Sequence, residues 1–315
     1  MTVCECFTID ISVQNSKPFV DANKKSVLQF PKRTAFSLFY PEIMQADPFL
    51  FVYNSRLFLF YEEMLLGRGL GFIKMVSTTD LKHWTKPVTI TYDEKCHFSY
   101  PFVFEEGGDI YMMPETGCDH NIRLYKAVND DLTRFELYKV ILARDKEPEN
   151  LYFDFADSSL YKKGNTYYLF TSYCDDKTYY LELYTSSRFD GDYKLHPESP
   201  ICVSNKYGRC AGSLIEANGK LYRPTQDCEI VYGGQVHIME IDELTLNTYK
   251  EHLVKENVIP QEQEYYKEGG HQVNFAEFKG QTVIATDVRF TTSFLLERIR
   301  LKIMKLLHLR KNNEY

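Results

Sequence analysis

Acidic residues recur at matching positions along this 315-residue chain, in places where they could carry out general acid–base chemistry. Asp47 and Asp157 each precede an apolar run, and Glu115 ends another one. Carboxyl groups that share a narrow site, and whose pKa values are pushed apart by their surroundings, can make and break glycosidic bonds. Asp47, Glu115 and Asp157 are therefore the candidate catalytic residues.

A second set of polar residues could bind a substrate or a phosphate group. Guanidinium groups bind phosphate through paired hydrogen bonds. The alternatives are an ion pair with a neighbouring acid for Arg209, a buried or outward-facing structural role for Arg223 and packing in the core for Tyr100. The predicted binding residues are Tyr100, Arg209, Arg223, Gln226, His271 and Asp287.

Five copies of one hairpin pattern must position these residues. Each copy has an apolar run, a tight turn and a second apolar run. The turns are separated by steps of 53, 56, 55 and 61 residues, and they are marked by Ser55, Gly108, Gly164, Gly219 and Gly280. A hairpin that returns about every 50 residues is typical of a β-propeller with four strands per blade. The sequence therefore predicts an all-β protein, a five-bladed β-propeller.

The register of the hairpins predicts a ring of polar side chains. Seven positions after the turn residues stand Glu62, Glu115, Thr171, Gln226 and Asp287, and the first runs are preceded by Asp47, Tyr100, Asp157, Gly212 and Asn274. An antiparallel hairpin returns the end of its second strand to the level where the first began. Both sets should therefore lie around the mouth of one central channel.

The two ends of the chain differ from the repeats. The alternating run at residues 6–13 is predicted to pair with the fifth hairpin and to close the ring, so that the propeller spans residues 1–290. Residues 291–315 show apolar residues at helical spacing opposite basic ones, which predicts a short amphipathic helix. Through residues 293–311 this helix could pack on the propeller, form a dimer contact or bind an anionic membrane surface.

Composition limits the function. The net charge of −7 argues against nucleic-acid binding. The chain has no apolar run long enough to span a bilayer and no export signal at its start, so we expect a cytoplasmic protein, with peripheral membrane attachment as an alternative. The eight cysteines include no pair with the spacing of a zinc site. We predict no metal site and no cofactor, and a divalent cation in the channel stays open as an alternative.

Several short motifs in the sequence resemble those of known carbohydrate-active families. Ala46-Asp47-Pro48-Phe49, with the stretch 77–84, resembles the five-bladed family-43 glycoside hydrolases. A closer likeness covers most of residues 40–290. It is to the N-terminal domain of glucosamine inositolphosphorylceramide transferases and to bacterial relatives linked to capsule and other cell-surface polysaccharide synthesis. The residues that carry it are Ser99-Tyr100-Pro101, Pro114-Glu115, Arg209-Cys210-Ala211-Gly212 and Gly269-Gly270-His271.

The resemblance implies roles for individual residues. Asp47 matches the general base of the hydrolases, and Asp157 lies at or next to the place of their general acid. Tyr100 stands where they carry a second aspartate, so that role is vacant.

The expected function is glycosyl transfer in polysaccharide or glycoconjugate biosynthesis, from a sugar donor, which could be nucleotide-linked, to a glycan acceptor. The alternatives are an inverting hydrolase of the arabinofuranosidase or xylosidase type, a phosphorylase, and a glycan-binding propeller without catalysis.

Overall fold

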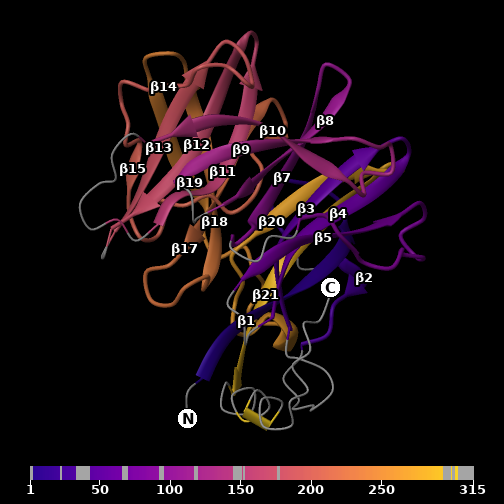
Figure 1. The fold of residues 1–315 in the computed structure, drawn as a ribbon. Helices are drawn as coiled ribbons and strands as arrows, with labels where there is room; N and C mark the ends of the chain where they lie inside the picture. Colours follow the sequence, from indigo (N-terminus) through magenta and orange to yellow (C-terminus); the bar gives the residue numbers. More distant parts are fainter. Residues whose placement is uncertain are drawn as a thin grey trace.

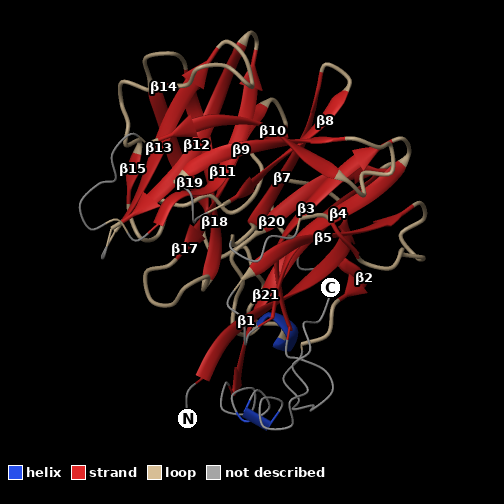
Figure 2. Cartoon of the chain, in the orientation of Figure 1, coloured by secondary structure: helices blue, strands red, loops and turns tan. Residues whose placement is uncertain are grey.

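A computed structural model of the chain shows the predicted five-bladed β-propeller. Figure 1 follows the strands along the chain, and Figure 2 shows that strands make up nearly all of the described secondary structure. The described residues are 3–21, 23–32, 43–65, 70–91, 96–116, 120–144, 151, 153–175, 178–293, 299 and 302–303.

Each of the first four blades is built from consecutive strands. Blade one contains β3 (Ile43–Tyr53), β4 (Arg56–Leu65), β5 (Gly71–Thr78) and β6 (Val88–Thr89). Blade two contains β7 (Ser99–Glu106), β8 (Asp109–Glu115), β9 (Asn121–Ala127) and β10 (Phe135–Ala143). Blade three contains β11 (Phe153–Lys163), β12 (Thr166–Cys174), β13 (Tyr179–Ser186), β14 (Lys194–Leu195) and β15 (Cys202–Val203). Blade four contains β16 (Ile215–Ala217), β17 (Lys220–Asp227), β18 (Gln235–Leu244) and β19 (Tyr249–Lys255).

Blade five joins the two ends of the chain, as predicted from the alternating run at residues 6–13. Its order is β2 (Lys25–Gln29), β1 (Val3–Gln14), β21 (Gln281–Ser293) and β20 (Val273–Phe278). In Figure 1, β1 and β21 run side by side, and they pair without a break from Val3↔Ser293 to Gln14↔Thr282. Such a closure covers strand edges that would otherwise be exposed.

A repeated backbone feature brings side chains to the centre of the ring. The innermost strands β3, β7 and β11 shift register near their starts, between Ala46 and Phe49, Ser99 and Phe102, and Ala156 and Ser159. At these shifts Asp47, Tyr100 and Asp157 have left-handed backbone angles, with φ of 51°, 44° and 49°. Such angles are unfavourable for residues other than glycine, and they cluster at functional sites.

Few residues of the predicted C-terminal helix, 291–315, lie among those that the structure describes. The predicted boundary at residue 290 falls inside β21, which continues as strand to Ser293. The rest of the predicted helix lies almost wholly outside the described residues, and Ile299, Lys302 and Ile303 have helical backbone. Among the described residues, no helix has the length and apolar character required to cross a membrane.

Candidate functional site

A cavity of about 460 Å³ lies at the predicted ring and is called the mouth pocket below. It is lined by Glu5, Phe7, Met44, Asp47, Glu62, Met64, His97, Ser99, Glu115, Arg209, Tyr232 and His271. Residues from four blades therefore meet there, as the hairpin register predicts. A larger cavity of about 740 Å³ lies at the opposite, turn end of blades three and four, beside Asn218 and Gly219, and contains none of the predicted site residues.

Asp47 lies at the wall of the mouth pocket and is almost fully buried. The backbone N–H of Tyr100, in the next blade, donates to its Oδ2 at 3.0 Å. Burial raises the pKa of Asp47 well above its usual value, the neighbouring His271 lowers it, and the Glu62 carboxylate raises it again. A carboxyl group in this setting is a stronger base, once ionised, than an exposed aspartate.

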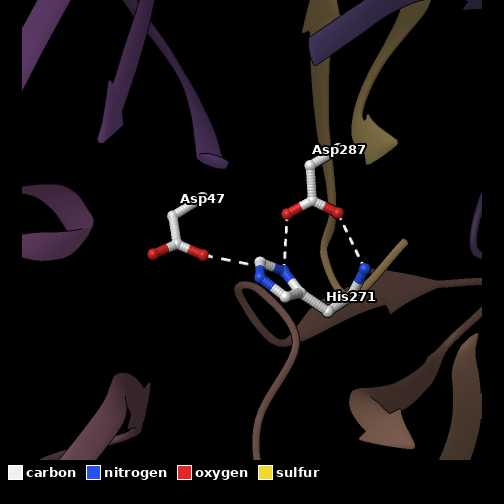
Figure 3. A group of neighbouring side chains, drawn as sticks. All are labelled: Asp47, His271 and Asp287. Atoms are coloured by element: carbon white, nitrogen blue, oxygen red, sulfur yellow. Dashed lines mark hydrogen bonds and ion pairs between the residues drawn. The ribbon is translucent and has the colours of Figure 1, made fainter. Parts of the chain in front are cut away.

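His271 lies between two carboxylates (Figure 3). Its Nδ1 is 2.5 Å from Asp287 Oδ2 and 3.8 Å from Asp47 Oδ1, and its backbone N–H donates to Asp287 Oδ1 at 2.7 Å. Burial disfavours the charged ring, but the Asp287 carboxylate, together with Asp47 and Asp157, outweighs burial and raises the pKa of His271 to about 9. Since one ligand atom from each of the three residues lies within 4.8 Å of the others, this group could also hold a cation.

Glu115 and Asp157 form the second acidic part of the site. The Asp157 N–H donates to Glu115 Oε2 at 2.9 Å, which repeats the contact between Tyr100 and Asp47 one blade further on. The Asp157 carboxylate pairs with the Arg209 Nε and accepts a hydrogen bond from Gln226 Nε2 at 3.2 Å. Burial, and then the nearby Asp157 charge, raise the pKa of Glu115 to about 7.

Tyr100 does not have the predicted role of contacting substrate with its ring. The side chain is 1% exposed, and its hydroxyl lies 2.9 Å from Ser159 Oγ and 3.0 Å from the Gly212 carbonyl, in blades three and four. The phenol thus joins three blades near the axis. Only its backbone N–H, bonded to Asp47, belongs to the site.

Arg223 is the second correction. Its guanidinium is fully buried and pairs with both carboxylate oxygens of Glu251 on β19, at 3.0 and 2.6 Å. Arg223 is three positions from Gln226 on the same strand, and an odd offset turns two side chains to opposite faces of a sheet. The alternation of side chains along β17 could therefore have shown that Arg223 does not face the same way as Gln226 and does not belong to the ring.

Glu62 and His97 also line the pocket, although neither is among the predicted catalytic or binding residues. The hairpin register gives Glu62 the same repeat position as Glu115, so a signal for Glu62 was present in the sequence; its side chain is 4% exposed. His97 Nε2 lies 3.2 Å from Glu62 Oε1, and the Gly71 N–H donates to His97 Nδ1 at 2.9 Å.

A close backbone approach at Gly71 fixes this pair. A Cβ at Gly71 would lie 2.3 Å from Glu62 Oε1 and 2.9 Å from His97 Cε1, so no larger residue fits without displacing them. Burial disfavours a charged His97, whereas Glu62 raises its pKa to about 9. A charged ring could not accept the Gly71 hydrogen bond, so we assign the neutral tautomer, which donates to Glu62.

The two cations of the pocket are engaged by acids. Arg209 pairs with Asp157 and His271 with Asp287, while the neutral His97 donates to Glu62. Phosphate binding would require these pairs to open, so the geometry disfavours the predicted phosphate-binding role. Hydroxyl and ammonium groups fit this lining better, because they donate hydrogen bonds to carboxylates.

Another part of the pocket wall is apolar. The Phe7 ring packs against the His271 ring at an interplanar angle of 33°, with centroids 4.0 Å apart, and Met44 and Met64 pack with the buried pair Cys6 and Phe290. The Tyr232 ring lies 5.4 Å from the Arg209 guanidinium. The mouth pocket therefore presents both charged and apolar groups to whatever enters it.

Comparison with known sequences places the chain in a family. The family described as glucosamine inositolphosphorylceramide transferase 1, N-terminal, matches residues 28–285. Glucosamine inositolphosphorylceramide transferase 1 from Oryza sativa subsp. japonica is 36% identical over 218 residues, and its counterpart from Arabidopsis thaliana is 34% identical over 217. Each match covers 67% of this chain but only 28% and 27% of those proteins, so the chain spans about a quarter of their length.

Solved structures share the fold at low identity. A family 117 glycoside hydrolase from Zobellia galactanivorans has a TM-score of 0.55 and 10% identity, over 78% of this chain and 84% of the other. A family 32 β-fructofuranosidase from Bombyx mori has a TM-score of 0.54 and 20% identity, over 76% of this chain and 54% of the other. These likenesses support the propeller architecture and nothing more specific.

Proposed function

The chain belongs to the family of glucosamine inositolphosphorylceramide transferase 1 N-terminal regions, and from this premise we propose that its mouth pocket binds a sugar and catalyses glycosyl transfer. Asp47 is the proposed general base and Glu115 the proposed general acid. In the proposed step, the acceptor O–H gives its proton to Asp47 while the acceptor oxygen attacks the anomeric carbon. The bond from that carbon to the leaving oxygen breaks, and this oxygen takes the Glu115 proton.

One observation carries the proposal: two carboxyl groups with raised pKa values line the same pocket, and each is held by the backbone N–H of the following blade. The pKa of Glu115, about 7, keeps a substantial fraction of the acid protonated at neutral pH. Asp47 has the charged His271 beside it, which favours the ionised base. Asp157, held by Arg209 and Gln226, serves to position Glu115.

The relatives and the charge of the pocket indicate the substrate class. The name of the rice and Arabidopsis proteins specifies glucosamine as the sugar and a ceramide-linked acceptor. An amino sugar suits a pocket whose cations are already paired and whose lining includes Glu5, Asp47, Glu62 and Glu115. The apolar wall suits an acceptor with an apolar part.

Hydrolysis is the second candidate, because an acid and a base in one pocket serve it equally well when water replaces the acceptor. The two functions differ in the acceptor alone. A measurement of the product therefore separates them.

The test combines thermal shift with turnover. Wild type and Asp47→Asn are melted with glucosamine, neutral sugars, nucleotide sugars and inorganic phosphate, and a ligand at 100 times its Kd should add about 2.7 kcal/mol to the free energy of unfolding. We expect sugars to stabilise both proteins and phosphate to stabilise neither. Turnover by Asp47→Asn should fall by roughly 10²–10⁴-fold.

The other outcomes assign the alternatives. Release of free sugar from aryl glycosides without an acceptor would favour the hydrolase. Sugar binding without turnover of any donor by the wild type would leave a glycan-binding propeller. Stabilisation by phosphate alone would contradict the pocket assignment.

A further inference from the structure

The loop between β17 and β18, residues 228–234, ends in an exposed apolar tip beside the mouth pocket and is called the Ile230 loop below. Ile230 is 91% exposed, the highest value among the exposed large apolar side chains of the described residues, and Val231 is 39% exposed. Tyr232, next in sequence, lines the pocket. The apolar tip therefore stands at the edge of the pocket opening.

The base of the Ile230 loop is tightly held. The Gly234 N–H donates to the Asp227 carbonyl at 3.1 Å, and the Cys228 N–H donates to the Asn205 carbonyl at 2.9 Å. Gly233 has a φ of +64°, and a Cβ there would lie 2.8 Å from His271 Cδ2 and 2.9 Å from Phe7 Cζ. This packing anchors both ends of the loop, and the fold therefore fixes the outward position of Ile230.

The apolar tip continues the apolar wall of the pocket. Tyr232 contacts Phe7 edge to face, with centroids 6.2 Å apart, and Phe7 belongs to the same wall as Met44 and Met64. An apolar path thus runs from inside the pocket over Tyr232 to Ile230. Tyrosine is favoured at such places, since its ring is apolar and its hydroxyl stays in contact with water.

We propose that the Ile230 loop inserts into the interfacial region of a lipid bilayer and holds the mouth pocket against the membrane surface. The exposed side chains of Ile230, Val231 and Tyr232 fall far short of the roughly 800 Å² per partner that a stable protein complex buries. The other large apolar side chains with high exposure lie on other strands and turns. A bilayer, in contrast, accepts even a small apolar group, because each buried CH₂ contributes about 0.8 kcal/mol and an interfacial tyrosine ring adds to it; attachment of this size is weak and reversible.

The test uses the 315-residue chain and vesicles of neutral phosphatidylcholine, so that attraction of the basic C-terminal residues to anionic lipid plays no part. We expect the wild type to co-sediment with the vesicles and Ile230→Asp to bind at least about tenfold more weakly. The matched control is Leu246→Asp. Leu246 is 55% exposed at the other end of β18, roughly 33 Å away, and its change should leave binding unaltered.

A second variant follows the loop directly. Ile230→Trp should show a blue-shifted emission on addition of the same vesicles, over the constant signal of Trp84. The proposal is overturned if the wild type does not bind neutral vesicles, or if Ile230→Asp binds them as well as Leu246→Asp does. It is also overturned if Ile230→Asp abolishes only self-association in size-exclusion chromatography. Vesicle binding needs no turnover, so this result is independent of the proposed catalysis.

Discussion

Asp47 in blade one and Asp157 in blade three occupy the same place in their blades but have different surroundings. Both follow an alanine at a register shift, and their φ angles are 51° and 49°. Asp157 pairs with the buried guanidinium of Arg209 and accepts a hydrogen bond from Gln226. Asp47 has no such direct pair, since His271 lies 3.8 Å away and is itself 2.5 Å from Asp287.

The difference shows that the repeat decides where a side chain lies, whereas the neighbouring blades decide what it can do. A carboxylate that forms a buried ion pair is a structural group, and its removal leaves an uncompensated charge. A carboxyl group whose pKa is raised by burial can exchange a proton with a substrate. We therefore assign the reactive role to Asp47 and a positioning role to Asp157.

The largest expected effect is on stability, from Asp157→Asn. The substitution leaves the buried Arg209 guanidinium without its main charge partner, which costs about 3–5 kcal/mol in comparable cases. We expect a loss of about 3 kcal/mol, near the lower end, because Glu115 lies 3.9 Å from Arg209 and supplies part of the charge. Denaturant unfolding measures the loss.

The matched control for that change is Asp47→Asn. An asparagine there removes a carboxyl group that burial already disfavours in its charged form, so the free energy of unfolding should change little or rise slightly. Equal losses of stability in the two variants would refute the distinction between the two aspartates.

The fold could be predicted from the sequence because it rests on local patterns that repeat. Turns such as Asn54-Ser55 and Asn218-Gly219 adopt the positive φ angles that tight hairpins need, and alternation marks the strands around them. The alternating run at residues 6–13 belongs to none of the five hairpins. It could be assigned to blade five, because a propeller does not leave a sheet edge open. Both conclusions need only spacing and periodicity.

The composition of the site was only partly predictable. Spacing placed Asp47, Glu115, Asp157, Gln226 and Asp287 around one opening, but it said nothing about their pairing partners. His97 lies in the segment between blades one and two, where no periodicity applies, and its role follows from the close approach of Gly71. The burial of the Tyr100 ring likewise depends on Ser159 and Gly212, which lie far away in sequence.

A smaller effect is expected in the pH dependence of stability, through Glu115. The pKa of this residue is raised from its usual value of 4.5 to about 7 in the folded protein, so the folded state binds more protons than the unfolded state between those two values. Stability should therefore fall as the pH rises from about 4.5 to about 7, by an amount on the order of 1–3 kcal/mol.

Glu115→Gln has no group to titrate at this position and should lack that part of the fall, which thermal melting across the pH range would show. In Asp157→Asn the pKa of Glu115 should move down, since the charge that helps to raise it is gone. An unchanged pH profile in Glu115→Gln would mean that the carboxyl group is not buried as described.

The smallest effect is expected from Gln226→Leu, which tests how firmly Asp157 is held. Gln226 Nε2 donates to Asp157 Oδ2 at 3.2 Å, and its Oε1 accepts from Cys228 Sγ at 3.2 Å. Leucine has a similar size but no hydrogen-bonding group, so we expect a loss of about 1–2 kcal/mol in denaturant unfolding. Arg209 alone should keep Asp157 in place, and sugar binding at Asp47 should persist. If Gln226→Leu instead abolished sugar binding, Asp157 and its partners would belong to the reactive part of the site and not to its support.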